Sequence, residues 1–411
     1  MSSPRLPPEI LDYILDTLHD EPDTLHSCSL VAKSWVPHAR RLLFVSVDIS
    51  PGNLGRWKET FPDPSNSPAC YTRTLHVLCS TDITMADAAE GGWISSFSRV
   101  LELELDLLRE GSLGTLEMFL IPFHGFSPIL KSLYIDSPIL PCSQFFKFAC
   151  SFPLLEDLTI NCQSLNDSDN PDAPQAIVPP SSPALTGSLR LRPRRGLGTI
   201  ARRLLDLPNG LRFRRLNLEW RHEEDIQWVK RLVEACRDTL EVLNITRLTR
   251  GASDPCSVGP RLIFVITDGS ALAPSTIDLS RAPKLQAITF SPETFNAEWI
   301  VAALETIAPK HRDLRRITIF LNDSAIASAS PNRRVLESIG ERVHKQWLDL
   351  DRLLLRLWES QSIRTEAVGT SLRDVRDAKA VFRCLLPEMT ERGVIEVSSY
   401  GSILHEFQRL L

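Results

Sequence analysis

Hydrophobic and polar positions alternate in short segments along most of the chain, starting near residue 75. Many of these segments have the form apolar-x-x-apolar-x-apolar, whose last positions alternate as in a strand with one buried face. The pattern predicts strands at residues 75–78, 100–105, 130–135, 155–160, 189–191, 213–218, 240–245, 285–290 and 314–319. Because helix-length segments separate these strands, a parallel arrangement is expected.

Amphipathic helices are predicted between the strands, because apolar residues recur there at helical spacing. Residues 223–236 and residues 297–307 are the clearest cases. Their stripes consist of Ile226, Val229, Leu232 and Val233, and of Ile300, Val301 and Leu304. Strand starts at 130 and 155 lie 25 residues apart, those at 213 and 240 lie 27 apart, and those at 285 and 314 lie 29 apart. These intervals resemble leucine-rich repeats and predict an α/β solenoid, with parallel strands on one face and helices on the other.

The array departs from regular leucine-rich repeats in two ways. The interval from residue 240 to residue 285 is 45 residues long. The Asn that the family carries after each strand is retained at Asn322 but replaced elsewhere by Pro138, Gln163, Arg221, Leu248 and Glu293. The turns must then satisfy their backbone groups in other ways, so we expect an irregular array. The alternative is a globular α/β domain whose strand–helix units imitate repeats.

Three regions are expected along the chain: residues 1–45, an array over 46–332, and a closing α/β part over 333–411. The closing part should contain a helix at 335–358, a strand near Ile363, a helix at 381–386 and a strand at 394–397. Residues 164–187 contain five prolines and an acidic cluster, and residues 250–261 are rich in Gly, Ser and Pro. We expect a flexible insertion and a loop there, each either a contact for another protein or an idle insertion.

The first forty-four residues predict three short helices. Pro7 and Pro8 start the first helix, and the Glu21-Pro22-Asp23 segment ends it. Its apolar stripe consists of Ile10, Leu11, Ile14, Leu15 and Leu18. Asp23 is placed to cap a second helix, with Leu25, Cys28, Val31 and Ala32, and Ser34 to cap a third, with Trp35, Ala39, Leu42 and Leu43. So small a bundle buries too little surface to be stable alone, and an apolar face should meet a neighbour.

These residues carry a resemblance to the F-box family. The segments Leu6 to Leu11, Leu25 to Trp35 and Leu43-Phe44 resemble the family's motif in order, spacing and residue type, in a form seen in mushroom-forming fungi. The resemblance implies a module that docks on a Skp-family adaptor. The matching residues, which contact the adaptor or form the module's own core, are Leu6, Pro7, Pro8, Ile10, Leu11, Ile14, Leu15, Leu25, Cys28, Leu30, Val31 and Trp35. The alternative is an unrelated three-helix cap.

The resemblance implies a non-catalytic substrate-recognition subunit of a Skp–cullin–F-box ubiquitin ligase. The adaptor would connect the chain to a cullin, and the repeats would hold an unknown client protein. A ubiquitin-charged enzyme elsewhere in the complex would then modify the client at raised effective concentration. The alternative is a scaffold or interaction protein that binds the adaptor outside the ligase.

Composition and charge narrow the class of protein. Apolar residues make up 43% and charged residues 24%, as in folded proteins. The 46 basic and 51 acidic side chains give a net charge of −5, so neither nucleic acid nor a membrane surface is an expected partner. Nine scattered cysteines without a C-x-x-C pair predict buried thiols in a reducing compartment. With no apolar run that suits a signal peptide or a membrane span, cytoplasm or nucleus is the expected location.

One motif points to a different chemistry. Gly196, Gly198 and Ala201 match G-x-G-x-x-A, and Glu219 follows about twenty residues later, as in dinucleotide-binding folds. Arg192 to Arg195 separate these glycines from the preceding strand, so a nucleotide-binding enzyme is only the remote alternative. The acids after His222 suit the first turn of a helix, and the arginines of 190–203 suit a solvated face or an acidic partner. Without a P-loop, G-x-S-x-G or H-E-x-x-H motif, we expect no cofactor, metal or catalytic residue.

Overall fold

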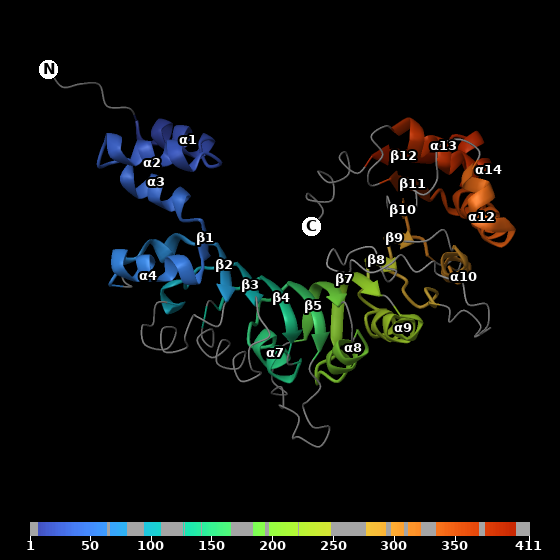
Figure 1. The fold of residues 1–411 in the computed structure, drawn as a ribbon, viewed down its shortest axis with the longest axis horizontal. Helices are drawn as coiled ribbons and strands as arrows, with labels where there is room; N and C mark the ends of the chain where they lie inside the picture. Colours follow the sequence, from blue (N-terminus) through green and yellow to red (C-terminus); the bar gives the residue numbers. More distant parts are fainter. Residues whose placement is uncertain are drawn as a thin grey trace, which may run out of the picture. The chain divides into compact units, whose positions relative to one another are not determined.

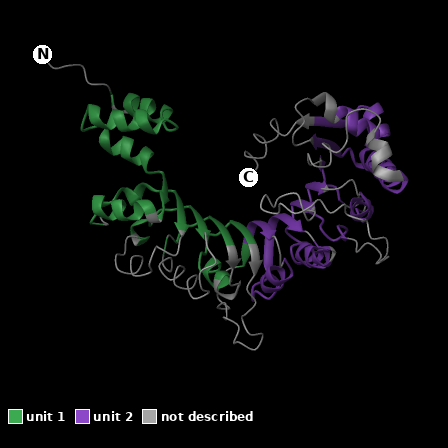
Figure 2. Ribbon diagram, in the orientation of Figure 1, with its two compact units in different colours: residues 1–185 green, residues 186–411 purple. Residues whose placement is uncertain are grey.

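The computed structural model describes residues 7–63, 66–79, 94–107, 126, 128–140, 142–165, 184–193, 197–220, 222–247, 277–292, 297–307, 311–321, 334–369 and 375–399. The chain is an α/β protein that divides into two compact units, residues 1–185 and residues 186–411 (Figure 2). Within each unit the strands follow one another in chain order, and the strand pairings that the structure gives are parallel (Figure 1).

The first unit begins with three short helices, α1 (Pro8–Thr17), α2 (Pro22–Val31) and α3 (Val36–Leu43), which we call the N-terminal module. Its strands are β1 (Ser46–Ile49), β2 (Thr74–Cys79), β3 (Glu102–Leu107), β4 (Ser132–Leu140) and β5 (Asp157–Leu165). Between the strands lie α4 (Pro51–Thr60), the 3₁₀ turns η2 (Pro68–Tyr71) and η3 (Ile94–Ser96), and α7 (Cys142–Ala149).

The second unit repeats the alternation of strand and helix. Its strands are β6 (Leu185–Pro193), β7 (Leu211–Trp220), β8 (Val242–Arg247), β9 (Ala287–Pro292), β10 (Arg316–Leu321), β11 (Arg364–Gly369) and β12 (Ile395–Ser399). Its helical segments are α8 (Leu197–Leu205), η5 (Glu223–Asp225), α9 (Ile226–Ala235), α10 (Glu298–Glu305), α12 (Arg334–Gln361), α13 (Val375–Leu385) and α14 (Pro387–Glu391). Of the helices described in either unit, none is long and apolar enough to span a membrane.

The apolar positions of the recurring motif form the core behind the strands. Around β4, Leu130, Leu133 and Ile135 are at most 1% exposed. Around β10, Leu314, Ile317 and Ile319 are at most 2% exposed. Burying one strand face in this way requires a covering layer, which the intervening helices supply. The predicted α/β, solenoid-like layout of parallel strands and helices is therefore confirmed within each unit.

A backbone hydrogen-bond relay marks the start of successive strands. The carbonyl oxygen of Val45 accepts bonds from the N–H groups of Arg73 (2.7 Å) and Thr74 (3.0 Å). The carbonyl of Arg73 accepts in the same way from Leu101 and Glu102. In the first unit the relay continues through Leu101 and Lys131, and in the second it runs through Arg214, Glu241, Gln286 and Arg315. These strand starts thus satisfy their backbone groups with backbone partners.

The predicted strands coincide with observed ones, whose boundaries lie a few residues away. β4 and β5 extend past the predicted ends of their strands, so Pro138 lies inside β4 and Gln163 inside β5. The predicted insertion was too wide, because Ser164 and Leu165 belong to β5 and residues 185–187 to β6. The remaining insertion, residues 166–183, and the predicted loop 250–261 lie outside the described residues.

The three N-terminal helices are present, but both predicted caps were wrong. Glu21 is the N-cap residue of α2, and Asp23 lies in its first turn. The reason is that Pro22, whose fixed φ suits a first helical position, starts the helix two residues earlier than predicted. Trp35 is the N-cap residue of α3, one residue after Ser34. The sequence analysis also missed β1, α4 and α7.

Candidate interaction surface on the N-terminal helices

The N-terminal module is held together by a small apolar core. Leu11 and Leu15 of α1 and Leu25 of α2 are 8%, 0% and 1% exposed. Five partly buried side chains pack against them, namely Leu18, Cys28, Trp35, Leu42 and Leu43. This core uses only one side of each short helix, so other apolar side chains of the module lie outside it.

Exposed apolar side chains concentrate on this module. Among the described residues eight large apolar side chains are exposed, and five of them lie on α1 and α2. They are Ile10 (47% exposed), Tyr13 (71%), Ile14 (37%), Leu30 (76%) and Val31 (67%). Residues three and four apart are neighbours on a helix, so Ile10, Tyr13 and Ile14 share one side of α1. Clustered apolar exposure of this kind marks interaction surfaces in soluble proteins.

The structure separates, by their exposure, the twelve residues whose sequence resembles the F-box motif. The exposed ones are Pro7, Ile10, Ile14, Leu30 and Val31, and the ones in or against the core are Leu11, Leu15, Leu25, Cys28 and Trp35. Leu6 lies outside the described residues, and only the backbone of Pro8 is described. The sequence analysis missed Tyr13, although its place three residues after Ile10 was a usable signal.

His38 ties α3 to α1 through two carboxylates. Its Nδ1 lies 2.7 Å from Oδ1 of Asp12, and its Nε2 lies 2.9 Å from Oδ1 of Asp16. Arg41, one turn further along α3, lies 3.6 Å from the same oxygen of Asp16. The imidazole is 9% exposed, whereas the side chains of Asp12 and Asp16 are 55% and 56% exposed. We call the His38–Asp12–Asp16 arrangement the His38 clasp.

The G-x-G-x-x-A motif, which suggested a nucleotide site, is explained by helix packing. A Cβ atom at Gly198 would stand 2.6 Å from Nε1 of Trp228, so the indole ring of α9 lies directly against the backbone of α8. The guanidinium carbons of Arg202 and Arg231 lie 5.4 Å and 4.8 Å from the centre of the same ring. Ala201 is fully buried, and Gly196 lies outside the described residues. A close helix contact is therefore enough to account for Gly198.

One of the acids after His222, Asp225, stabilises the turn before α9. Oδ2 of Asp225 accepts a hydrogen bond from the backbone N–H of His222 (3.1 Å), which closes the turn before α9. Over the described ranges, no three His, Cys, Asp or Glu side chains are grouped so as to hold a metal ion.

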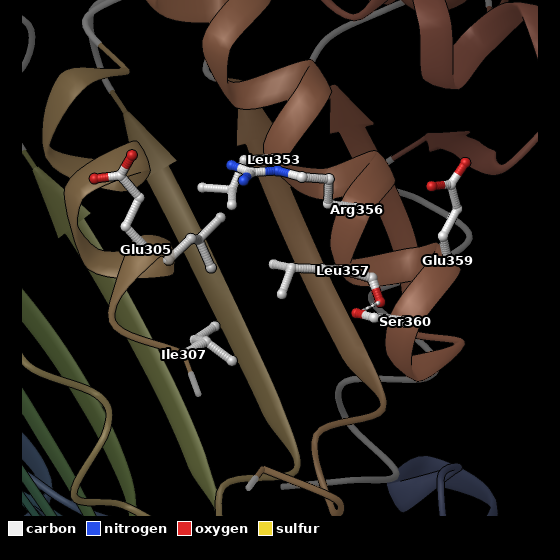
Figure 3. A pocket seen from close by; sticks show the side chains of 8 residues that line it. Glu305, Ile307, Leu353, Arg356, Leu357, Glu359 and Ser360 are labelled. Carbon is white, nitrogen blue, oxygen red and sulfur yellow. Dashed lines mark hydrogen bonds between the residues drawn. The ribbon is translucent and has the colours of Figure 1, made fainter. Parts of the chain in front are cut away.

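An open groove lies between α10 and the C-terminal half of α12 (Figure 3). Its floor is apolar and buried, formed by Leu304, Ile307, Leu353 and Leu357. Glu305, Arg356, Glu359 and Ser360 stand on its rim, and Glu359 is engaged by Arg392 at 2.6 Å. The rim groups do not converge on a common point, which a small-molecule site requires.

The polar face of the strands carries networks of charged side chains. In the first unit, Nδ1 of His76 lies 3.3 Å from Asp48 and Nε2 lies 3.3 Å from Asp106. Nearby, Asp136 accepts hydrogen bonds from Asn161 (2.7 Å) and the hydroxyl of Tyr134 (3.3 Å). Burial raises the pKa of Tyr134, and the charges of Asp136 and Asp106 raise it further. In the second unit, Arg192 pairs with Glu219 at 2.9 Å, and Arg364 with Glu366 at 3.2 Å.

No protein-family model matches this chain, and no curated protein matches its sequence. The function is therefore inferred from the N-terminal sequence pattern and from the side chains that the N-terminal module exposes.

Proposed function

We propose that this chain is a non-catalytic substrate-recognition subunit of a Skp–cullin–F-box ubiquitin ligase. The N-terminal module docks on a Skp-family adaptor, and the strand–helix array, which resembles leucine-rich repeats, holds a client protein. The observation that carries this proposal is the concentration of exposed apolar side chains on the helices whose sequence resembles the F-box.

Burial of the exposed side chains would offset much of the free-energy cost of docking. Fully burying one large aliphatic or aromatic side chain contributes about 1.5–3 kcal/mol. Five such side chains, on α1 and α2, are available for this. Together they are comparable with the roughly 4–15 kcal/mol that association costs in lost freedom. Ile10, Ile14, Leu30 and Val31 are thus the adaptor contacts, with Tyr13 added, whereas Leu11, Leu15 and Leu25 support them from the core.

The chain contributes binding and geometry. The adaptor connects it to a cullin, which also carries the ubiquitin-charged enzyme, and the client's lysines meet that enzyme at raised effective concentration. The polar strand face, with its networks around His76 and Arg364, offers hydrogen-bonding side chains for a protein client. Such a complex would work in the cytoplasm or the nucleus.

The test is adaptor binding by the full chain, measured by titration calorimetry with a purified Skp-family adaptor. Ile10→Asp and Leu30→Asp place a charge among the exposed apolar side chains and should abolish binding. Leu154→Asp is the matched control, because Leu154 is 50% exposed but lies outside the N-terminal module. This control should bind like the wild-type chain. A wild-type chain that does not bind would refute the proposal.

A second experiment separates ligase membership from a scaffold role. If the adaptor-bound chain enters the ligase, a cullin should co-purify with it, and the cullin should be lost in the Ile10→Asp variant. Adaptor without cullin, in a preparation where other adaptor complexes do retain the cullin, would favour the scaffold.

A further inference from the structure

The His38 clasp and the exposed apolar side chains lie on opposite flanks of α1. At about 100° per residue, Ile10 and Ile14 lie roughly 200° around the helix from Asp12 and Asp16, with the core residues Leu11 and Leu15 between the two groups. The clasp thus holds one flank of α1 against α3, while the other flank presents Ile10 and Ile14 to solvent.

The geometry of the clasp restricts rotation of α1 about its own axis. Asp12 and Asp16 are one turn apart, and a single imidazole contacts both, so α1 can neither roll nor slide without breaking a contact. Leu11 and Leu15 anchor α1 to the core, and the clasp adds a second anchor on the flank of Asp12 and Asp16. Together they define which side chains α1 presents.

The clasp should contribute little to the free energy of unfolding, unlike a contact in the core. The carboxylates of Asp12 and Asp16 are more than half exposed, and ion pairs of such groups add little to folding stability. Removing the clasp should thus leave the helices folded but allow α1 to adopt several orientations.

We propose that His38 is a positioning residue for adaptor docking: through Asp12 and Asp16 it holds α1 in the orientation that presents Ile10 and Ile14. This inference rests on the proposed function. If the docking orientation is populated about one time in ten without the clasp, the apparent dissociation constant rises about tenfold.

The test measures adaptor affinity and melting temperature of the full chain for a set of variants. His38→Ala removes both contacts and should weaken binding about tenfold with little change in melting temperature. His38→Arg supplies a planar, two-pronged donor and should recover most of the affinity. Asp12→Asn with Asp16→Asn should reproduce the loss from the other side of the clasp. His26→Ala is the control, because His26 is an exposed histidine of the same module.

The outcomes are separable. Wild-type binding together with unchanged binding by His38→Ala overturns the inference and leaves the proposed function intact. Failure of His38→Arg to recover affinity also overturns it, because a general structural defect would not be repaired by a two-pronged donor. If His38→Ala does not fold, the inference is tested with His38→Arg and with the double variant Asp12→Asn/Asp16→Asn instead. Absence of wild-type binding refutes the proposed function itself.

Discussion

A Cβ atom on Gly198 would stand 2.6 Å from Nε1 of Trp228 and 3.1 Å from two ring carbons, Cδ1 and Cε2. These distances are well below van der Waals contact, so a larger residue at this position would require Trp228 to shift. The same glycine belongs to the sequence motif that suggested a dinucleotide site, which shows how a packing requirement can imitate a chemical one.

Gly198→Ala should therefore destabilise the chain by about 1–3 kcal/mol, the usual cost of overpacking. Gly55→Ala in α4 is the matched control, since a Cβ there meets nothing within 4 Å. Alanine in a helix interior is favoured over glycine by about 0.5–1 kcal/mol, so this control should be neutral or stabilising. Urea unfolding of both variants checks the prediction. Equal stabilities would mean that Trp228 moves aside freely.

Nicotinamide dinucleotide should not raise the melting temperature of the chain. A ligand that binds only the folded state must raise it when present well above its dissociation constant. A concentration-dependent increase that disappears in Gly198→Ala would restore the enzyme hypothesis and contradict the packing explanation.

Core and docking residues of the N-terminal module should respond differently to truncation. Leu15 is fully buried, so Leu15→Ala should cost about 2–5 kcal/mol. Ile10 is 47% exposed, and Ile10→Ala should change stability by no more than about 0.5 kcal/mol while weakening adaptor binding. Hydrogen exchange over residues 8–43 reports on the module's stability. Rapid exchange in Ile10→Ala would place this side chain in the core.

Asp351 of α12 fixes the start of α14. Its Oδ2 and Oδ1 accept hydrogen bonds from the N–H groups of Glu388 (2.7 Å) and Met389 (3.1 Å), and the residue is 1% exposed. Burial raises the pKa of this carboxyl despite both bonds. Asp351→Ala leaves two backbone donors without partners and should cost about 1–3 kcal/mol. Asp351→Asn removes the buried charge and keeps one acceptor. In thermal denaturation its melting temperature should therefore lie between those of Asp351→Ala and the wild type.

Stability should fall at alkaline pH because of buried thiols. Burial raises the pKa of Cys150 to about 11 and the pKa values of Cys162 and Cys236 to about 12, from an ordinary value of 9.0. The folded state thus holds these protons more tightly than the unfolded state. The resulting stabilisation is complete below about pH 9 and is lost as pH rises toward 12, at about 1.4 kcal/mol per pH unit for each thiol.

Cys162→Val tests this linkage. Between about pH 8 and 10 its free energy of unfolding should fall by about 1 kcal/mol less than that of the wild type. Cys70→Ser is the control, because Cys70 is exposed and should leave the pH dependence unchanged. Urea unfolding at the two pH values measures the difference, and parallel losses in all three proteins would contradict the role of Cys162.

The sequence predicted the strands well because the apolar positions of their motif are the positions that the fold buries. Leu130, Leu133 and Ile135 are apolar for the same reason that they are buried. Two of the elements it missed are short: β1 has four residues, and α7 has eight, although Cys142, Phe145, Phe146 and Ala149 do follow helical spacing. Both caps were misplaced because the pattern of polar residues outweighed the start signal of Pro22 and Pro37.

The candidate surface was predictable as a set of residues but not as a surface. Spacing alone places Ile10, Leu11, Ile14 and Leu15 in one apolar stripe, yet two of them face the core and two face solvent. That separation depends on where α2 and α3 pack. The His38 clasp had no sequence signal, because it joins residues 22 and 26 positions apart in the chain.

The relay at the strand starts has a consequence for how such a chain can change over time. Each strand of the relay takes its register from the carbonyl group of the residue just before the preceding strand, as Gln286 does from Glu241, 45 positions earlier in the chain. Residues added between two strands need not disturb this bond. A longer connection therefore leaves the register of the next strand unchanged. Mutational drift in the connections is therefore decoupled from the alignment of the strands, which permits large sequence divergence without loss of the architecture.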